Sequence, residues 1–105
     1  MGIGFGSAAK LLTNVSTALT GPVATCQNAI KTFSFGITGS GTMTLNLYGS
    51  DDGSIFGWLA TVVLDVALNP GDVLLLPANS LTQFKVVTSS PTGSPVVNAH
   101  VTGVD

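Results

Sequence analysis

Apolar and polar residues alternate one by one through most of this chain, and this period of two constrains the fold more than any other feature. In the segment 31–37, KTFSFGI, the side chains of Phe33, Phe35 and Ile37 lie on one face of an extended strand. The segment 42–50, TMTLNLYGS, repeats the pattern. Between them lies TGSG, a short glycine-containing link that is typical of a hairpin. The sequence therefore predicts two half-buried strands joined by a tight turn.

More extended segments follow at regular spacing. Residues 58–68 alternate over a longer span and end at NPG, where Pro removes a hydrogen-bond donor and Gly permits positive φ. The segment 9–18 fits a strand or a short helix, and its β-branched residues favour the strand. The other expected strands are 21–27, 72–76, 81–89 and 96–104. About seven or eight short strands predict an all-β fold, an antiparallel β-sandwich of the jelly-roll or Ig-like type.

The first ten residues, MGIGFGSAAK, are rich in glycine, and the large apolar side chains of Ile3 and Phe5 stand between these glycines. Such a segment lacks the bulk to build a core, so we expect residues 1–10 to form a flexible arm, which either stays mobile or orders against a neighbour. Residues 11–105 then form a single sandwich domain. The segment lacks the basic region of a signal peptide, and no apolar run approaches the roughly 18 residues of a membrane span. We therefore expect no association with a membrane.

Charged residues are scarce in this chain. They make up 8% of it, against roughly 25% in an average globular protein, while 45% of its residues are apolar. The formal net charge is −2 and no basic stripe is present, so we expect no nucleic-acid partner. A free monomer usually covers itself with charged residues for solubility. The low charge predicts a surface largely buried against neighbours, with a secreted domain rich in Ser and Thr as the alternative.

Four apolar residues fall on the expected outward faces of strands, Leu59, Val63, Leu74 and Val87, and of these Leu59, Val63 and Val87 are candidates for a protein interface. Ile3 and Phe5 join them as the part of the arm that would contact a neighbour. Outward apolar residues are equally expected where a central strand is buried on both of its faces. Alternation alone does not separate these two interpretations, and both stay open.

The chain holds few of the side chains that carry out catalysis. It has one His, one Cys and no Glu, and Cys26 has no second cysteine with which to form an internal disulfide. We expect Cys26 to be a small buried apolar residue, because nothing in the sequence supports its pairing with His100. Nitrogen and sulfur ligands at metal-binding spacing are absent from the sequence. We therefore expect no enzyme activity, no catalytic residues, no metal site and no cofactor.

Two adjacent carboxylates stand in the middle of the stretch 45–58, LNLYGSDDGSIFGW. Asp51, Asp52 and Gly53 fit a turn, because Asp bonds its own backbone and Gly takes positive φ. The alternative is a calcium site, although the distal Glu of an EF-type loop is missing. Turn chemistry accounts for all three residues, so we expect them to shape and solvate a turn between two strands.

Aromatic residues flank this turn on both sides. Trp58 has the same parity as Val62 and Leu64 in the segment 58–68, so we expect it to anchor the core. Tyr48 has the opposite parity to the apolar residues of its strand and is expected to be half exposed. The alternative is that both rings stack on a sugar, as aromatic side chains with a polar edge can.

The stretch 45–58 and the segments that follow resemble the small β-sandwich virion proteins of tailed bacteriophages. In those proteins a hairpin of the form sG-tvtl-GS-DG--W--la precedes a strand fkyvRv, a glycine-containing turn and a last strand. The resemblance covers roughly residues 21–104. The family's Arg in the penultimate strand is missing, and a contact that requires a bidentate guanidinium is not carried over. The residues that match the pattern are Gly41, Thr44, Leu45, Gly49, Ser50, Asp52, Gly53, Trp58, Leu59, Ala60, Phe84, Lys85 and Val87.

This resemblance implies a non-enzymatic structural protein of the particle, and more specifically a head decoration or cement protein that forms symmetric oligomers on a shell. The partners it implies are the major capsid protein or another virion protein, together with copies of the chain itself. The location it implies is the virion. Two other roles stay open, a carbohydrate- or receptor-binding domain of a tail or fibre and a neck or tail adaptor.

Overall fold

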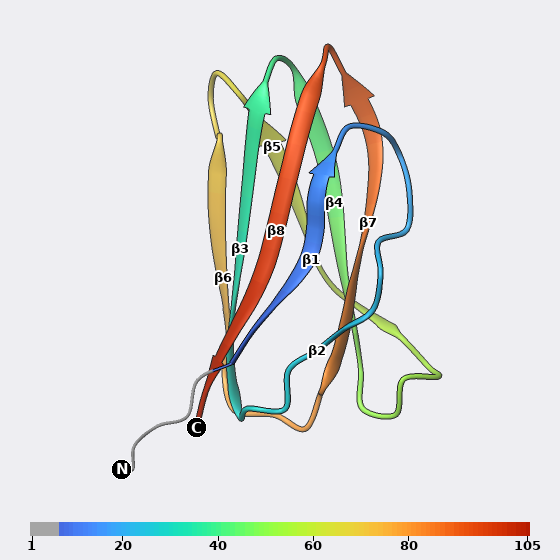
Figure 1. Cartoon of the computed structure of the whole chain (residues 1–105), viewed down its shortest axis with the longest axis vertical. Helices are drawn as coiled ribbons and strands as arrows, with labels where there is room; N and C mark the ends of the chain where they lie inside the picture. Colours follow the sequence, from blue (N-terminus) through green and yellow to red (C-terminus); the bar gives the residue numbers. More distant parts are fainter. Residues whose placement is uncertain (1–6) are drawn as a thin grey trace.

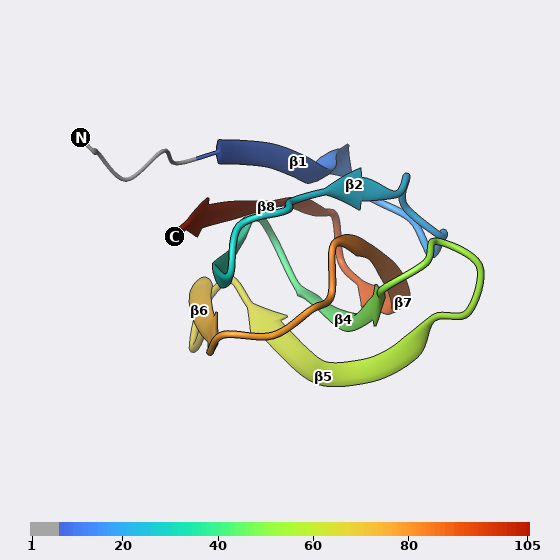
Figure 2. The ribbon, with the colours of Figure 1, turned by 90° about the horizontal axis from the view of Figure 1, so that it is seen from below.

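Two antiparallel four-stranded sheets pack face to face in the computed structural model, which describes residues 7–105 (Figure 1; Figure 2). The predicted all-β antiparallel sandwich is therefore confirmed. Within the described residues, no helix is long and apolar enough to cross a membrane. The first sheet has the order β1-β8-β3-β6 and the second the order β2-β7-β4-β5. The strands are β1 (Ser7–Val15), β2 (Ala24–Thr25), β3 (Ile30–Gly39), β4 (Thr42–Ser50), β5 (Gly57–Asp65), β6 (Gly71–Leu76), β7 (Gln83–Thr92) and β8 (Pro95–Val104).

This strand order is that of a jelly roll, in which the chain crosses from one sheet to the other at almost every connection. The TGSG link is consequently not a hairpin: β3 pairs with β6 and β8, whereas β4 pairs with β5 and β7. Gly39 and Gly41 both have positive φ, 85° and 89°, which lets the chain turn sharply from one sheet into the other. Among the connections between the eight described strands, only the one from β4 to β5 stays within a sheet.

The core lies between the sheets and is built from the alternating residues of the central strands. Phe33, Phe35 and Ile37 of β3 are buried as predicted. The alternating apolar residues of β4, in the opposite sheet, are buried as well. The ring of Phe33 meets that of Phe84 edge-on, with centroids 5.0 Å apart, and so joins the two sheets. Cys26 is 2% exposed in the same core, which agrees with a small apolar role.

The first sheet begins inside the segment that was expected to be a flexible arm. Ser7 pairs with Gly103 and Lys10 with His100, so residues 7–10 belong to strand β1 at the edge of the sheet. The run of small residues gives little sequence signal for a strand, and its extended shape comes from pairing with β8. The other expected arm residues, Ile3 and Phe5 among them, lie outside the described part of the chain.

Candidate functional site

Trp58 lies on the outside of the molecule with 60% of its surface exposed, and the prediction that it anchors the core is wrong. The reason is a register shift in the β4–β5 ladder. Leu47 pairs with Ala60 but Tyr48 pairs with Trp58, so β5 carries one extra residue at this point. The extra residue reverses the alternation, with the result that Trp58 faces solvent while Leu59 packs against the core.

The outward surface of the second sheet brings this tryptophan next to other side chains. Tyr48 on β4 lies between Trp58 on β5 and Lys85 on β7, because all three occupy paired positions. In the next row of the same face, Asn46 pairs with Thr61. Paired side chains on one face of a sheet are about 5 Å apart at their Cβ atoms. We call the surface formed by Asn46, Tyr48, Trp58 and Thr61 the Trp58 face.

A chain of hydrogen bonds holds the indole of Trp58 in place on this face. The indole Nε1–H donates to Thr61 Oγ1 over 3.0 Å, and that hydroxyl donates to Asn46 Oδ1 over 2.6 Å. Both bonds lie on the exposed side of the sheet, so they orient the ring without burying it. The broad face of the indole is thus left open to solvent in a defined orientation.

A second aromatic ring stands at the same end of the sheet. Phe56, in the loop between β4 and β5, has the Lys85 ammonium 4.3 Å from its ring centroid. A cation at this distance over an aromatic face is attracted by the ring quadrupole. The contact ties the β4–β5 loop to strand β7, which lies on the far side of β4 from β5. Lys85 therefore positions the loop beside the Trp58 face.

Asp52 organises the β4–β5 loop through its own carboxylate. Its Oδ1 accepts hydrogen bonds from the backbone N–H groups of Ser54 and Ile55, at 2.8 and 3.0 Å, and from the Ser50 hydroxyl at 2.9 Å. The N–H of Ile55, followed by that of Ser54, lowers the pKa of Asp52, because these donors stabilise the charged form. Gly53 takes a φ of 79°, a conformation that suits glycine.

Asp51 lies exposed in the same loop, next to the carboxylate that holds the turn. In the described part of the chain, no group of three or more His, Cys, Asp and Glu side chains is placed to hold a metal ion. Cys26 and His100 occupy different environments. The thiol is buried and donates to Asn28 Oδ1 over 3.8 Å, whereas the imidazole is exposed on the outer face of the first sheet.

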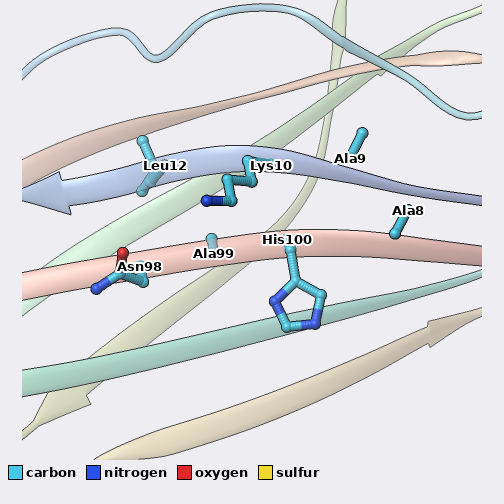
Figure 3. Close-up of a pocket in the computed structure, with 7 residues that line it drawn as sticks. All are labelled: Ala8, Ala9, Lys10, Leu12, Asn98, Ala99 and His100. Carbon is cyan, nitrogen blue, oxygen red and sulfur yellow. The ribbon is translucent and has the colours of Figure 1, made fainter.

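His100 lines a partly open hollow of about 310 Å³ on strands β1 and β8 (Figure 3). Figure 3 shows the side chains of His100 and Lys10 on adjacent strands, with Asn98 further along β8. The amide of Asn98 bonds Asn14 twice: its Oδ1 accepts from the Asn14 backbone N–H at 3.0 Å, and its Nδ2 donates to Asn14 Oδ1 at 3.3 Å. These bonds hold β1 against β8 where their register is irregular, so the polar groups at this end of the hollow serve the fold.

The predicted interface residues fall in three different environments. Val63 is 56% exposed on the outward face of β5. Val87 on β7 is half-buried and forms an isolated backbone bridge with Thr20 of the loop between β1 and β2. Leu59 packs against the core, so the prediction that it faces outward is wrong. The cause is the register shift in the β4–β5 ladder that also turns Trp58 outward. Val63 and Val87 thus remain candidates for an interface.

Sequence reasoning missed the exposed apolar residues of β6. Val73 and Leu75 on β6 are 61% and 68% exposed, and they alternate with the half-buried Leu74 and Leu76. The run VLLL hides this alternation, because residues on both faces are apolar. The signal available in the sequence was the shortness of the strand between two prolines, Pro70 and Pro77, which is typical of an edge.

The fold is similar to that in the crystal structure of the SPBc2 prophage-derived protein YomS. The TM-score is 0.67 at 11% sequence identity, and the match covers 98% of this chain and 97% of that one. A second structure, from Bacillus endospore appendages described as a novel family of disulfide-linked pili, matches with a TM-score of 0.48 at 12% identity. It covers 95% of this chain and 84% of that one. No protein-family model matches the sequence, and no curated protein matches it either. At these identities the likeness to YomS is a likeness of fold.

Proposed function

We propose that the chain is a non-enzymatic structural protein of a bacteriophage particle. In this role it decorates or cements the capsid through contacts with the major capsid protein or another virion protein, and with copies of itself. Its fold, similar along almost the whole chain to that of a prophage-derived protein, supports the proposal. The low charge supports it as well, since charged residues make up 8% of the sequence and leave much of the surface suited to protein contacts.

The observation that carries the proposal is the exposed apolar edge of the first sheet. β6 is the last strand in that sheet, so one side of its backbone is unpaired within the described residues (Figure 1). Val73 and Leu75 are exposed on it, and none of its six residues is Lys or Pro. Natural edge strands are usually guarded by such residues against pairing with other chains. The prolines of this edge, Pro70 and Pro77, flank the strand, and its one charged residue is Asp72, so the apolar run VLLL that follows Asp72 is suited to adding a strand from a second copy or from a shell protein.

An apolar hollow beside β6 offers a place for a side chain of the partner. Its volume is about 220 Å³ and it opens between the edges of the two sheets. Binding energy in protein interfaces is concentrated in apolar or aromatic anchors that fill pockets of this kind. The residues that line the hollow are Phe33, Leu47, Leu59, Ala60, Leu74, Leu75 and Leu76.

Two measurements on the full chain test the proposal. Size-exclusion chromatography with light scattering gives its oligomeric state. Co-sedimentation with heads of the phage that encodes it, produced with its gene deleted, gives its affinity for the shell. We expect an oligomer, saturable binding to the heads, or both. Leu75→Lys should weaken the association at least about tenfold, because it places a charge in the apolar edge.

Val23→Lys is the matched control for this test. Val23 is 49% exposed in the loop before β2, so the variant adds the same charge at an exposed apolar residue away from β6. We expect it to associate as the wild type does. A chain that stays monomeric and also fails to bind heads lacking it would contradict the proposal, and so would equal losses in both variants.

A further inference from the structure

We propose that the Trp58 face binds one neutral hexopyranose ring, stacked on the indole of Trp58. The starting observation is the 60% exposure of this side chain on β5, the edge strand of the second sheet, where it pairs with Tyr48 next to the register shift. An indole is a large apolar surface to leave in water, and aromatic rings dominate binding energy where they are later covered. This inference goes beyond the structural role proposed above and stands on different residues from the β6 edge.

The indole is already oriented for a ligand. Its Nε1–H is bound to Thr61 Oγ1 at 3.0 Å, and Thr61 is in turn bound to Asn46 at 2.6 Å. A ring held in this way loses little conformational freedom when a second ring stacks on it, which removes one of the main costs of binding. The nitrogen is directed along the sheet surface, so the broad apolar face of the ring remains for contact.

Polar groups lie beside the exposed ring, as recognition of a sugar requires. Asn46 uses its Oδ1 to accept from Thr61, so its amide nitrogen keeps two N–H donors, and these bond no other described residue. The Tyr48 side chain, which pairs with Trp58, brings a hydroxyl that both donates and accepts. A hexopyranose with equatorial hydroxyls presents an apolar C–H face surrounded by such donors and acceptors. The apolar platform and its polar neighbours match that surface.

The charge and the size of the Trp58 face further restrict the class of ligand that it fits. None of the four residues of the Trp58 face is charged, and the nearest cation, Lys85, is engaged with the ring of Phe56. A neutral sugar is therefore favoured over an acidic one. Trp58 and Tyr48 occupy paired positions about 5 Å apart at Cβ, which is too close for each to stack on a ring of its own. One sugar ring fits, with Tyr48 at its edge.

The single tryptophan makes this site directly observable. Trp58 is the only Trp in the chain, so a ligand that stacks on it changes the whole tryptophan emission. The experiment titrates the full chain with methyl glucoside, methyl galactoside and N-acetylglucosamine, and probes an array of oligosaccharides built from these sugars. We expect a saturable change in emission with at least one sugar. We also expect matching array binding that Trp58→Ala abolishes and that Asn46→Asp weakens about tenfold.

The variants separate binding from folding. Asn46→Asp keeps an acceptor for Thr61 and so keeps the indole in place, but it removes the two N–H donors. Val63→Ala, on the same face of β5 and outside the Trp58 face, is the matched control and should bind as the wild type does. Circular dichroism confirms that each variant is folded. Absence of binding by every sugar, or unchanged array binding by Trp58→Ala, would overturn the inference.

The same variants distinguish this inference from the structural role. Trp58→Ala should still bind phage heads, whereas Leu75→Lys should lose head binding and keep sugar binding. If Trp58→Ala instead loses head binding and the wild type binds no sugar, the Trp58 face is a protein contact and the sugar site is refuted. If the wild-type chain binds a sugar but does not bind phage heads, only the structural proposal is contradicted.

Discussion

Lys31 is a charged residue placed in the core of the sandwich. It is 1% exposed, and its Nζ donates to the backbone carbonyl and to the side-chain oxygen of Asn79, at 3.4 and 3.2 Å. The ammonium also lies 5.8 Å from the centroid of the Phe84 ring. Burial lowers the pKa of Lys31, and the nearby Cys26 thiol offsets part of this effect. The parity of Lys31 with Phe33 already places it on the inward face of the strand.

The first prediction is that Lys31→Met leaves the free energy of unfolding at pH 7 unchanged or raises it by up to about 2 kcal/mol. Replacing a buried charge by an apolar side chain of similar length is often neutral or stabilising. Because the folded-state pKa is lowered, the cost of the charge is fully present at pH 7. The cost falls as the pH rises through the lowered folded-state pKa, and it is gone above the unfolded pKa of about 10.5. The wild type should therefore gain stability relative to the variant as the pH rises.

Urea unfolding followed by circular dichroism, at pH 7 and at about pH 10, checks this prediction. Lys10→Met removes one positive charge from an exposed lysine and controls for the change in net charge. A Lys31→Met variant destabilised by more than about 2 kcal/mol at pH 7 would contradict it, since the two bonds to Asn79 would then outweigh the cost of burial. A wild type whose free energy of unfolding falls relative to that of the variant as the pH rises would also contradict it.

At the scale of the element, β5 shows how one extra residue changes the role of its neighbours. The shift between Leu47 and Tyr48 turns Leu59 inward and Trp58 outward. Inward, Leu59 comes so close to Gly49 that a Cβ built on this glycine would lie 2.8 Å from the leucine Cδ1. A side chain at position 49 would require Leu59 and its neighbours Leu81 and Phe84 to shift, which shows how closely Leu59 packs against the core.

The second prediction follows from this contact. Leu59→Ala should lower the free energy of unfolding by about 2 kcal/mol, because it removes apolar contacts from a partly buried position. Trp58→Ala should change it by no more than about 0.5 kcal/mol, as surface substitutions usually do. Chemical denaturation of the two variants side by side gives both values. A larger loss for Trp58→Ala than for Leu59→Ala would show that the indole anchors the core after all.

Alternation predicts β3 and β4 well, because both strands are unbroken on their inward faces. It fails at the start of β5, since Trp58, Ala60, Val62 and Leu64 keep an apolar period of two whether or not the partner strand shifts its register. A bulge is a property of the pair of strands, and the sequence of one strand does not record it. For this reason the sequence places Trp58 wrongly in the core, although it correctly predicts that Tyr48, the other aromatic residue of this face, is half exposed.

At the scale of the whole molecule, the sequence predicts a sandwich but leaves the order of its strands open. The TGSG link has the composition of a hairpin, yet it joins strands of opposite sheets. Local turn chemistry permits both outcomes, because Gly39 and Gly41 allow a sharp reversal in either case. The choice is made by packing between strands far apart in sequence, such as β3 against β8 and β4 against β7.

The outermost pairing of this kind is that of β1 with β8, and it leads to the last prediction. Ser7 pairs with Gly103, and its hydroxyl bonds Asn28 and lies 3.6 Å from the Sγ of Cys26. The start of β1 therefore covers the buried thiol as well as extending the sheet. A chain of residues 11–105 should be less stable than one of residues 7–105 by about 1–3 kcal/mol, since it loses several strand hydrogen bonds. Its Cys26 should also react faster with a thiol reagent.

Thermal unfolding and the rate of reaction with an aromatic disulfide reagent measure the two effects on the same samples. Ser7→Ala in the longer chain is the control, because it removes the hydroxyl but keeps the strand paired with β8. If strand pairing protects the core, Ser7→Ala should react nearly as slowly as its parent. Equal stability and equal thiol reactivity in the two truncated chains would show that the sandwich closes without the first residues of β1. The domain would then begin at residue 11, as the sequence alone predicts.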